Sequence, residues 1–211
     1  MNTSLQPLRI NSLLAQALGG VVPGSKMLIV GRPEMGMAML CAELLVKIVP
    51  ALRQGAYWLD AARNPSAIFG LVDHIPFGFS RLDVVSQAKD LDPPTIWREV
   101  LSNEMRRGAV VVVDSLERWA SGPAEQKALI EQLAMRPDTG FVLSYVDQRP
   151  QLAQHVETFF DAVAIVNSDC IEVTQCRWTP GPRVVSRRPM TTEEVASRDE
   201  HKPQQRKGGT G

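Results

Sequence analysis

One stretch near the amino terminus constrains the fold more than any other, the twelve residues from Met27 to Ala38. An apolar segment, 27–30, runs into a loop bounded by Gly31 and Gly36 and directly on into an apolar, helix-forming segment. A strand, a glycine-containing loop and a helix in this order build a phosphate-binding loop, whose pattern is G-x-x-x-x-G-K-[S/T]. In that pattern backbone N–H groups and the lysine hold phosphate, and the hydroxyl holds Mg²⁺.

Two positions of the loop depart from this pattern. Gly31 and Gly36 keep the glycine spacing, but Met37 stands at the lysine position and Ala38 at the Ser/Thr position. The sequence therefore predicts the frame of a nucleotide site without its two chemical groups. The candidate nucleotide-binding residues in this loop are Gly31, Arg32, Pro33, Glu34, Met35, Gly36, Met37 and Ala38.

Length and charge set the class of protein. A chain of 211 residues is long enough for one α/β domain with a full core. Lys+Arg and Asp+Glu are both 23, so the chain as a whole has no bias towards polyanions. From residue 183 to the end, seven basic residues stand against four acidic ones, which makes this end mildly basic. That asymmetry is weak support for a nucleic-acid partner.

Cysteines and apolar runs indicate the compartment. The three cysteines have no metal-ligand spacing, so we expect neither a metal site nor a disulfide framework, and a reducing cytoplasm fits best. Residues 1–10 show no signal peptide. The longest apolar run, 37–49, is interrupted by Glu43 and Lys47 and is too short to span a bilayer. We therefore expect a soluble, cytoplasmic protein without a membrane partner.

Strands and helices alternate along the chain. Hydrophobic periodicity, caps and turn residues predict strands at 26–30, 56–59, 82–85, 109–113, 140–146, 162–166 and 171–175, and helices at 10–18, 37–49, 66–73, 95–108, 124–134 and 151–159. Pro50 is expected to end the second helix, and the last two strands to form an antiparallel edge hairpin. Such alternation predicts a mostly parallel sheet with helices on both faces. One domain is expected over 1–185, followed by a disordered, mildly basic tail over 186–211.

Polar residues follow several of the predicted strands. In parallel sheets the ligand crevice lies beyond the carboxyl ends of the strands, where Asp60, Asp114 and Ser144 fall. The run Val110–Val113 followed by Asp114 and Ser115 is typical of a Walker B element, in which a strand delivers a carboxylate to Mg²⁺. Asp60 and Asp114 are thus the candidate catalytic carboxylates. The competing interpretation makes Asp60 a turn cap and Asp114 a strand-end relic.

Taken together, these motifs resemble the RecA/KaiC-like branch of P-loop ATPases over about residues 8–183. The resemblance rests on the loop, the Walker B strand, the turn 18–25 (Leu-Gly-Gly-Val-Val-Pro-Gly-Ser), and the segments 161–166 and 171–177. It implies a RecA-like three-layer sandwich with a mostly parallel central sheet, helices on both faces and a C-terminal antiparallel edge hairpin. The family is broad, so the fold alone does not fix a biological role.

Departures from the family pattern bear on the chemistry. KaiC-like members end the second strand in a catalytic glutamate, where this chain has Asp60. Their K-x-R element, which can reach a neighbouring subunit's phosphate, has here lost its lysine and kept Arg177. Each lost charge of this kind typically removes roughly 10²–10³-fold in rate. The resemblance therefore implies a degenerate Walker A loop and a pseudo-ATPase.

Two interpretations of the loop stay open. Weak binding of ATP with Mg²⁺, or of another anion, at the helix N-terminus would use backbone N–H groups and Arg32. Alternatively the loop only packs, with Met35, Met37 and Met39 filling the space where phosphate would lie. The second interpretation predicts no cofactor.

A second candidate surface is the segment 177–183, which contains Arg177, Trp178 and Arg183. This aromatic and basic loop would contact single-stranded nucleic acid or a neighbouring subunit, or else cover a sheet edge.

Three functions follow from these features. The first is a catalytically degenerate RecA-like regulatory or accessory subunit in DNA maintenance or repair, whose partner is an active RecA-like ATPase or a second copy. Accessory factors of the ImuA and SulA type resemble this pattern. The second is a slow KaiC- or recombinase-type ATPase, and the third a nucleic-acid-binding module that uses residues 177–188 and the tail.

Overall fold

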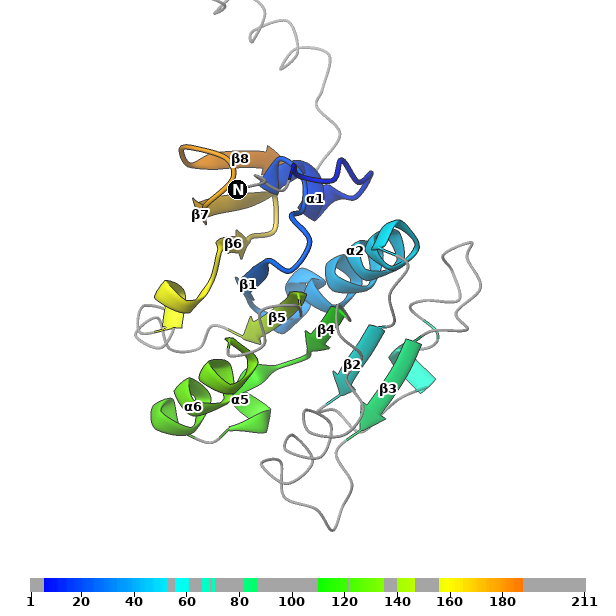
Figure 1. Ribbon diagram of the computed structural model, residues 1–211, viewed down its shortest axis with the longest axis vertical. Coiled ribbons are helices and arrows are strands. Elements are labelled where there is room, and N and C mark those ends of the chain that lie inside the picture. Colours follow the sequence, from blue (N-terminus) through cyan, green and yellow to red (C-terminus); the bar gives the residue numbers. More distant parts are fainter. Residues whose placement is uncertain are drawn as a thin grey trace, which may run out of the picture.

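The computed structural model describes residues 6–52, 56–60, 66–68, 70, 82–86, 110–120, 122–134, 140–146 and 156–187. Within these ranges the strands form one eight-stranded sheet in the order β3-β2-β4-β5-β1-β6-β7-β8 (Figure 1). The strands are β1 (Lys26–Gly31), β2 (Ala56–Asp60), β3 (Leu82–Ser86), β4 (Val110–Val113), β5 (Gly140–Val146), β6 (Ala162–Val166), β7 (Cys170–Cys176) and β8 (Arg183–Ser186). The predicted helix at 95–108 and the tail from 188 lie outside the described residues.

Strand directions divide the sheet into two parts. From β3 to β6 all neighbouring strands run parallel. β7 runs antiparallel to β6 on one side and to β8 on the other. The α/β class and the mostly parallel sheet with an antiparallel edge, as expected from the sequence, are confirmed at this level.

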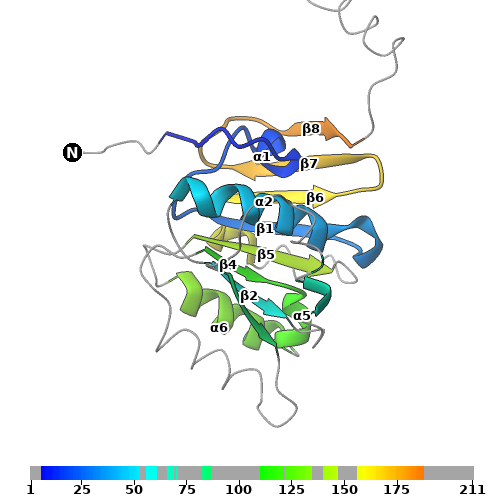
Figure 2. The same cartoon turned by 90° about the vertical axis from the view of Figure 1, so that its right-hand side faces the viewer.

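Helices cover both faces of the sheet. α1 (Leu13–Leu18) and α2 (Met37–Leu52) lie on one face, and α5 (Leu116–Trp119) and α6 (Pro123–Ala134) on the other (Figure 1). Figure 2 looks onto the face that carries α1 and α2. Side chains alternate along β1, so that Met27 and Ile29 join the first core while Leu28 and Val30 join the second. Because both faces are covered, the central strands are continuous apolar runs.

Local capping sets the bounds of α1. The side chain of Ser12 accepts a hydrogen bond from the backbone N–H of Ala15 at 3.1 Å, which fixes the first turn. Gly19 ends the helix with φ +74°, the left-handed conformation that glycine adopts without a side-chain clash. The helix is therefore shorter than the predicted 10–18, because Ser12 rather than Ile10 stands at its boundary.

Two predicted elements differ from the structure. The prediction that Pro50 ends the second helix is wrong, because α2 continues to Leu52. Packing of an apolar helix face supplies most helical stability and here outweighs the local cost of one proline near the end. Of the helix predicted at 151–159, the described part is a 3₁₀ turn, Glu157–Phe159.

Among the described residues, the structure adds a helix and a strand that the sequence did not predict. They are α5, directly after the Walker B-like strand, and β8, which ends at Ser186, one residue past the expected domain boundary. β8 pairs with β7 from Val173↔Arg183 to Cys170↔Ser186. Within the described ranges, none of the helices has the length and apolar character needed to cross a membrane.

Candidate functional site

The loop between β1 and α2 has the predicted strand–loop–helix frame. β1 ends at Gly31, a 3₁₀ turn spans Pro33–Met35, and α2 begins at Met37. Gly36 joins the turn to the helix with φ +71°, a conformation that L side chains rarely adopt. The predicted order of strand, glycine-containing loop and helix is therefore present.

Close packing beneath the loop explains its first glycine. A Cβ atom on Gly31 would lie 2.9 Å from the carbonyl oxygen of Val166 on β6 and 3.1 Å from the sulfur of Met37. The Met37 side chain, only 4% exposed, therefore turns back towards Gly31 and belongs to the core between α2 and the sheet. The residue at the lysine position fills space and presents no group to the outside of the loop.

The other loop residues divide between the core and the surface. Met35 and Ala38 are partly buried against the same core. Met39 is 48% exposed, so the expectation that all three methionines fill the loop is wrong for this one. The reason is helical geometry, since residues two apart on a helix do not share a face. Glu34 is exposed.

Two arginines lie at or near the loop. Arg32 within it is exposed. Arg187, directly after β8, places its Nη2 atom 3.6 Å from the position that a Cβ atom on Gly36 would occupy. Its Nη1 atom donates to the backbone oxygen of Asn167 at 2.7 Å. The sequence places Arg187 only in the basic segment 177–188, because no local signal links it to a loop about 150 residues earlier; the pairing of β8 brings it there.

Asp114 stands at the carboxyl end of β4. Its backbone N–H donates to the oxygen of Leu59 on β2 at 3.1 Å, and its Oδ1 accepts from the Ser115 hydroxyl at 3.3 Å. Ser115 has φ +56°, an uncommon conformation for a residue other than glycine. The indole N–H of Trp119 donates to the backbone oxygen of Asp114 at 3.1 Å. These bonds fix the turn that follows the Walker B-like strand.

The carboxylate of Asp114 also acts on α2. Burial raises the pKa of the Cys41 thiol above its usual range, and the charge of Asp114 raises it further. Cys41 lies one helical turn after Ala38, so the structure brings the Walker B-like carboxylate towards the first turns of α2.

Asp60 ends β2 and is fully buried. β2 and β4 are paired with Leu59 opposite Val113, so Asp60 and Asp114 lie at the same edge of the sheet as the loop. The strand order puts β2 three strands from β1, roughly 14 Å away at the usual spacing.

Ser144 lies opposite Ile29 and two residues before the end of β5. Within the described ranges, no group of three His, Cys, Asp or Glu residues could hold a metal ion.

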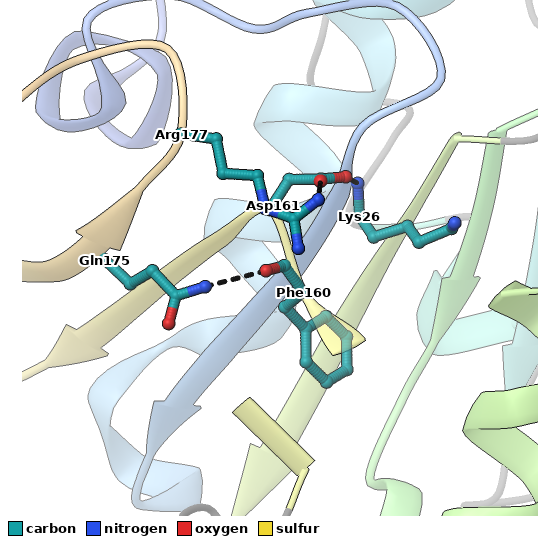
Figure 3. A network of polar contacts seen from close by, with 5 residues as sticks. All are labelled: Lys26, Phe160, Asp161, Gln175 and Arg177. Atoms are coloured by element: carbon teal, nitrogen blue, oxygen red, sulfur yellow. Dashed lines mark hydrogen bonds and ion pairs between the residues drawn. The ribbon is translucent and has the colours of Figure 1, made fainter. Parts of the chain in front are cut away.

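Arg177 lies at the other end of the sheet (Figure 3). Its Nη1 atom pairs with Oδ1 of Asp161 at 2.8 Å, and Oδ2 of the same carboxylate accepts from the backbone N–H of Lys26 at 2.8 Å. Because β7 is antiparallel, its carboxyl end meets the amino ends of the parallel strands. The length of β1 separates this end from Gly31 by about 16 Å, so Arg177 is remote from the loop of its own chain.

Trp178 and Arg183 cap the carboxyl end of α1. The indole N–H of Trp178 donates to the backbone oxygens of Leu18 and Gly20, both at 3.2 Å. The guanidinium of Arg183 lies against Gly19, where a basic side chain suits the helix end. Trp178 is half-buried. Residues 177–182 form the turn of the β7–β8 hairpin, and Arg183 begins β8.

Comparison with known proteins adds no family. A scan against protein-family models found no match, and a search of curated proteins found none either. The function of the site therefore has to be inferred from its own geometry.

Proposed function

We propose that this chain is a RecA-like pseudo-ATPase that keeps the frame of an ATP site and acts as a regulatory or accessory subunit through protein contacts. Three features of the fold support a RecA-like sandwich. The glycine loop follows β1, Asp114 follows β4 at the same sheet edge, and the last strands form an antiparallel hairpin. Helices on both faces complete the three layers.

The observation that carries the proposal is the burial of Met37 against Gly31. A lysine at this position would hold phosphate oxygens, whereas the thioether is uncharged and is directed into the core. Ala38 supplies no oxygen for Mg²⁺, a cation that takes oxygen ligands. Because each missing group that stabilises the transition state costs roughly 10²–10³-fold in rate, the loss of the lysine and of the hydroxyl together leaves no efficient ATP hydrolysis.

Arg177 supports a role in contacts between subunits. Its side chain is 63% exposed and lies about 16 Å from its own loop along β1. It is thus available to a neighbouring molecule while contributing nothing to its own chain's loop. The proposed partner is an active RecA-like ATPase or a second copy of this chain, and DNA maintenance or repair is the role that the resemblance to RecA-like proteins implies.

Calorimetric titration of the full chain with ATP and Mg²⁺ tests this proposal. We expect no binding tighter than about millimolar, which corresponds to about −4 kcal/mol. Hydrolysis should stay at the background rate. Micromolar binding would refute the pseudo-ATPase, because it would require groups that replace the lysine and the hydroxyl.

One observation favours a second candidate, a slow ATPase with an unorthodox loop. The guanidinium of Arg187 lies beside Gly36, where the N-terminus of α2 offers backbone N–H groups to an anion. If Arg187 replaces the lysine, the wild-type chain binds ATP and Arg187→Gln weakens that binding at least tenfold, about 1.4 kcal/mol. Arg9→Gln is the matched control, because that arginine is exposed and lies outside the loop.

A further inference from the structure

A small pocket opens at the amino end of the sheet, on the opposite side from the glycine loop. Its volume is about 250 Å³, and its walls are the turn 22–25 together with Asp161, Arg177 and Trp178. Pockets for drug-sized ligands span roughly 300–1,000 Å³. This one therefore suits a single side chain or a small molecule rather than a nucleotide.

The turn 22–25 places Ser25 in the pocket wall. The backbone N–H of Ser25 donates to the oxygen of Val22 at 3.0 Å. Pro23 occupies the second position and Gly24, with φ +79°, the third, which is the sequence and geometry of a type II turn. The turn holds Ser25 directly before β1 and leaves it only 6% exposed.

The hydroxyl of Ser25 lacks an internal partner. Its Oγ atom is fully buried and makes no hydrogen bond to any residue that the structure describes. A buried polar atom left unpaired destabilises the folded state, so native proteins rarely keep one. Because Ser25 lines the pocket, rotation about its χ1 angle can turn the hydroxyl towards a molecule bound there, which then supplies the missing bond.

Arg177 adds hydrogen-bond donors to the same pocket. One of its N–H groups is bonded to Asp161, and a guanidinium carries five. Both oxygens of Asp161 are already engaged, one by Arg177 and one by the backbone N–H of Lys26. The remaining N–H groups of Arg177 and the hydroxyl of Ser25 therefore favour a ligand that accepts hydrogen bonds. Carboxylates and phosphates match an arginine best.

Charge and shape favour the carboxylate. The charges of Asp161 and Arg177 offset each other, so this pocket would hold a doubly charged phosphate poorly. Val22, Pro23 and Trp178 supply apolar surface next to the polar groups. A group with a short apolar stem and one negative charge matches both parts of the wall, and acidic side chains have this form.

We propose that this pocket binds the carboxylate of a glutamate or aspartate side chain presented by a protein partner. The Ser25 hydroxyl and the Arg177 guanidinium donate to the carboxylate, and Trp178 packs against its methylene groups. The inference depends on the pocket alone and goes beyond the proposed function. Titrations with carboxylates and with ATP report on opposite ends of the sheet, so the failure of one is distinguishable from the failure of the other.

Nuclear magnetic resonance of the ¹⁵N-labelled full chain tests the inference. The indole N–H signal of Trp178, assigned with Trp178→Phe, is followed during titration with N-acetyl-glutamate methylamide. We expect a shift with a millimolar dissociation constant and binding at least tenfold weaker, about 1.4 kcal/mol, for the matched glutamine compound. Glutarate distinguishes the source: binding tenfold tighter than the blocked glutamate would overturn the assignment to a protein side chain. No shift with either carboxylate would overturn the proposal.

Two variants separate recognition from structure. Arg177→Gln should weaken binding of the blocked glutamate at least tenfold. Lys127→Gln, which changes an exposed lysine on α6, should leave this binding unchanged. Ser25→Ala should weaken binding while leaving the melting temperature unchanged or higher, because it removes a hydroxyl without a partner. A melting temperature several degrees lower would show that the hydroxyl is bonded inside the folded chain, which would overturn its role. An unchanged affinity in Arg177→Gln would overturn the role of the guanidinium.

Discussion

The sulfur of Met37 lies 3.1 Å from the point where a Cβ atom on Gly31 would stand. This contact joins the first glycine of the loop to the residue at its lysine position. The carbonyl oxygen of Val166 closes the same space from β6, at 2.9 Å from that point. Packing against Val166 and Met37 therefore holds the loop. Gly31 allows this close approach and Gly36 adopts the left-handed conformation, whether or not an anion binds.

Restoring the two missing groups should restore nucleotide binding. In Met37→Lys with Ala38→Thr, the ammonium and the hydroxyl would return to a loop whose backbone frame is intact. We expect the affinity for ATP with Mg²⁺ to rise at least tenfold, about 1.4 kcal/mol, in calorimetric titration. Met39→Lys is the control, because it adds the same charge on the exposed side of α2. If the double variant folds but still does not bind ATP, the loop is not a nucleotide site that has lost its lysine and its hydroxyl.

Glycine is required at position 31 for close approach. Gly31→Ala would force a methyl group against the Val166 carbonyl and the Met37 sulfur. We expect the free energy of unfolding to fall by about 1–3 kcal/mol, measured by urea denaturation. Gly122→Ala is the matched control, since no described atom lies within 4 Å of its new Cβ, and it should stay within about 0.5 kcal/mol of wild type. An equal loss of stability in both variants would contradict the close packing of Gly31 against Val166 and Met37.

Much of the central sheet could be predicted from the sequence, because a parallel strand buried on both faces is a continuous apolar run. Val110–Val113 and the segment before Gly31 are such runs, and the polar residues after them mark the carboxyl edge. β8 could not be predicted in this way. It is four residues long and half-exposed, and it forms only because β7 offers its edge.

Contacts between distant segments escaped prediction for the same reason. Arg187 reaches the loop through β8, and Trp178 reaches α1 through the β7–β8 turn. The sequence shows that Trp178 is an aromatic residue in a basic loop, but its hydrogen bonds depend on where α1 ends. The orphan hydroxyl of Ser25 likewise depends on burial and not on residue type.

Trp178 should contribute more to the stability of the fold than to the binding of nucleic acid. Trp178→Phe removes the donor that serves the oxygens of Leu18 and Gly20, so the free energy of unfolding should fall by about 1 kcal/mol. Val184→Ala, at an exposed position on the neighbouring strand, should change it by less than about 0.5 kcal/mol. Thermal unfolding measures both. Unchanged stability combined with a loss of salt-dependent binding to single-stranded DNA would instead make Trp178 a stacking platform.

The two members of the Asp161–Arg177 ion pair should contribute unequally to stability. Arg177→Ala removes a 63% exposed partner and should cost less than about 1 kcal/mol. Asp161→Ala also takes away the acceptor for the Lys26 backbone N–H and should cost about 1–3 kcal/mol. Asp161→Asn, which keeps a carbonyl acceptor, should recover most of that loss in urea denaturation. Equal costs for the two alanine variants would mean that the ion pair, and not the backbone bond, anchors the start of β1.

Cys41 should be the slowest thiol to react and should make stability depend on pH. Burial and the charge of Asp114 raise the pKa of the Cys41 thiol, while an unfolded chain titrates near its ordinary value of about 8.5. The stabilising contribution is thus complete below about pH 8.5 and is lost as the pH rises towards the folded pKa, at about 1.4 kcal/mol per unit. Ellman's reagent at pH 8 should modify the half-exposed Cys170 and Cys176 first. Urea denaturation between pH 8 and 10 should show a shallower decline for Cys41→Ala than for wild type. Parallel declines, or rapid modification of Cys41 in the folded chain, would place this thiol outside the core between α2 and the sheet.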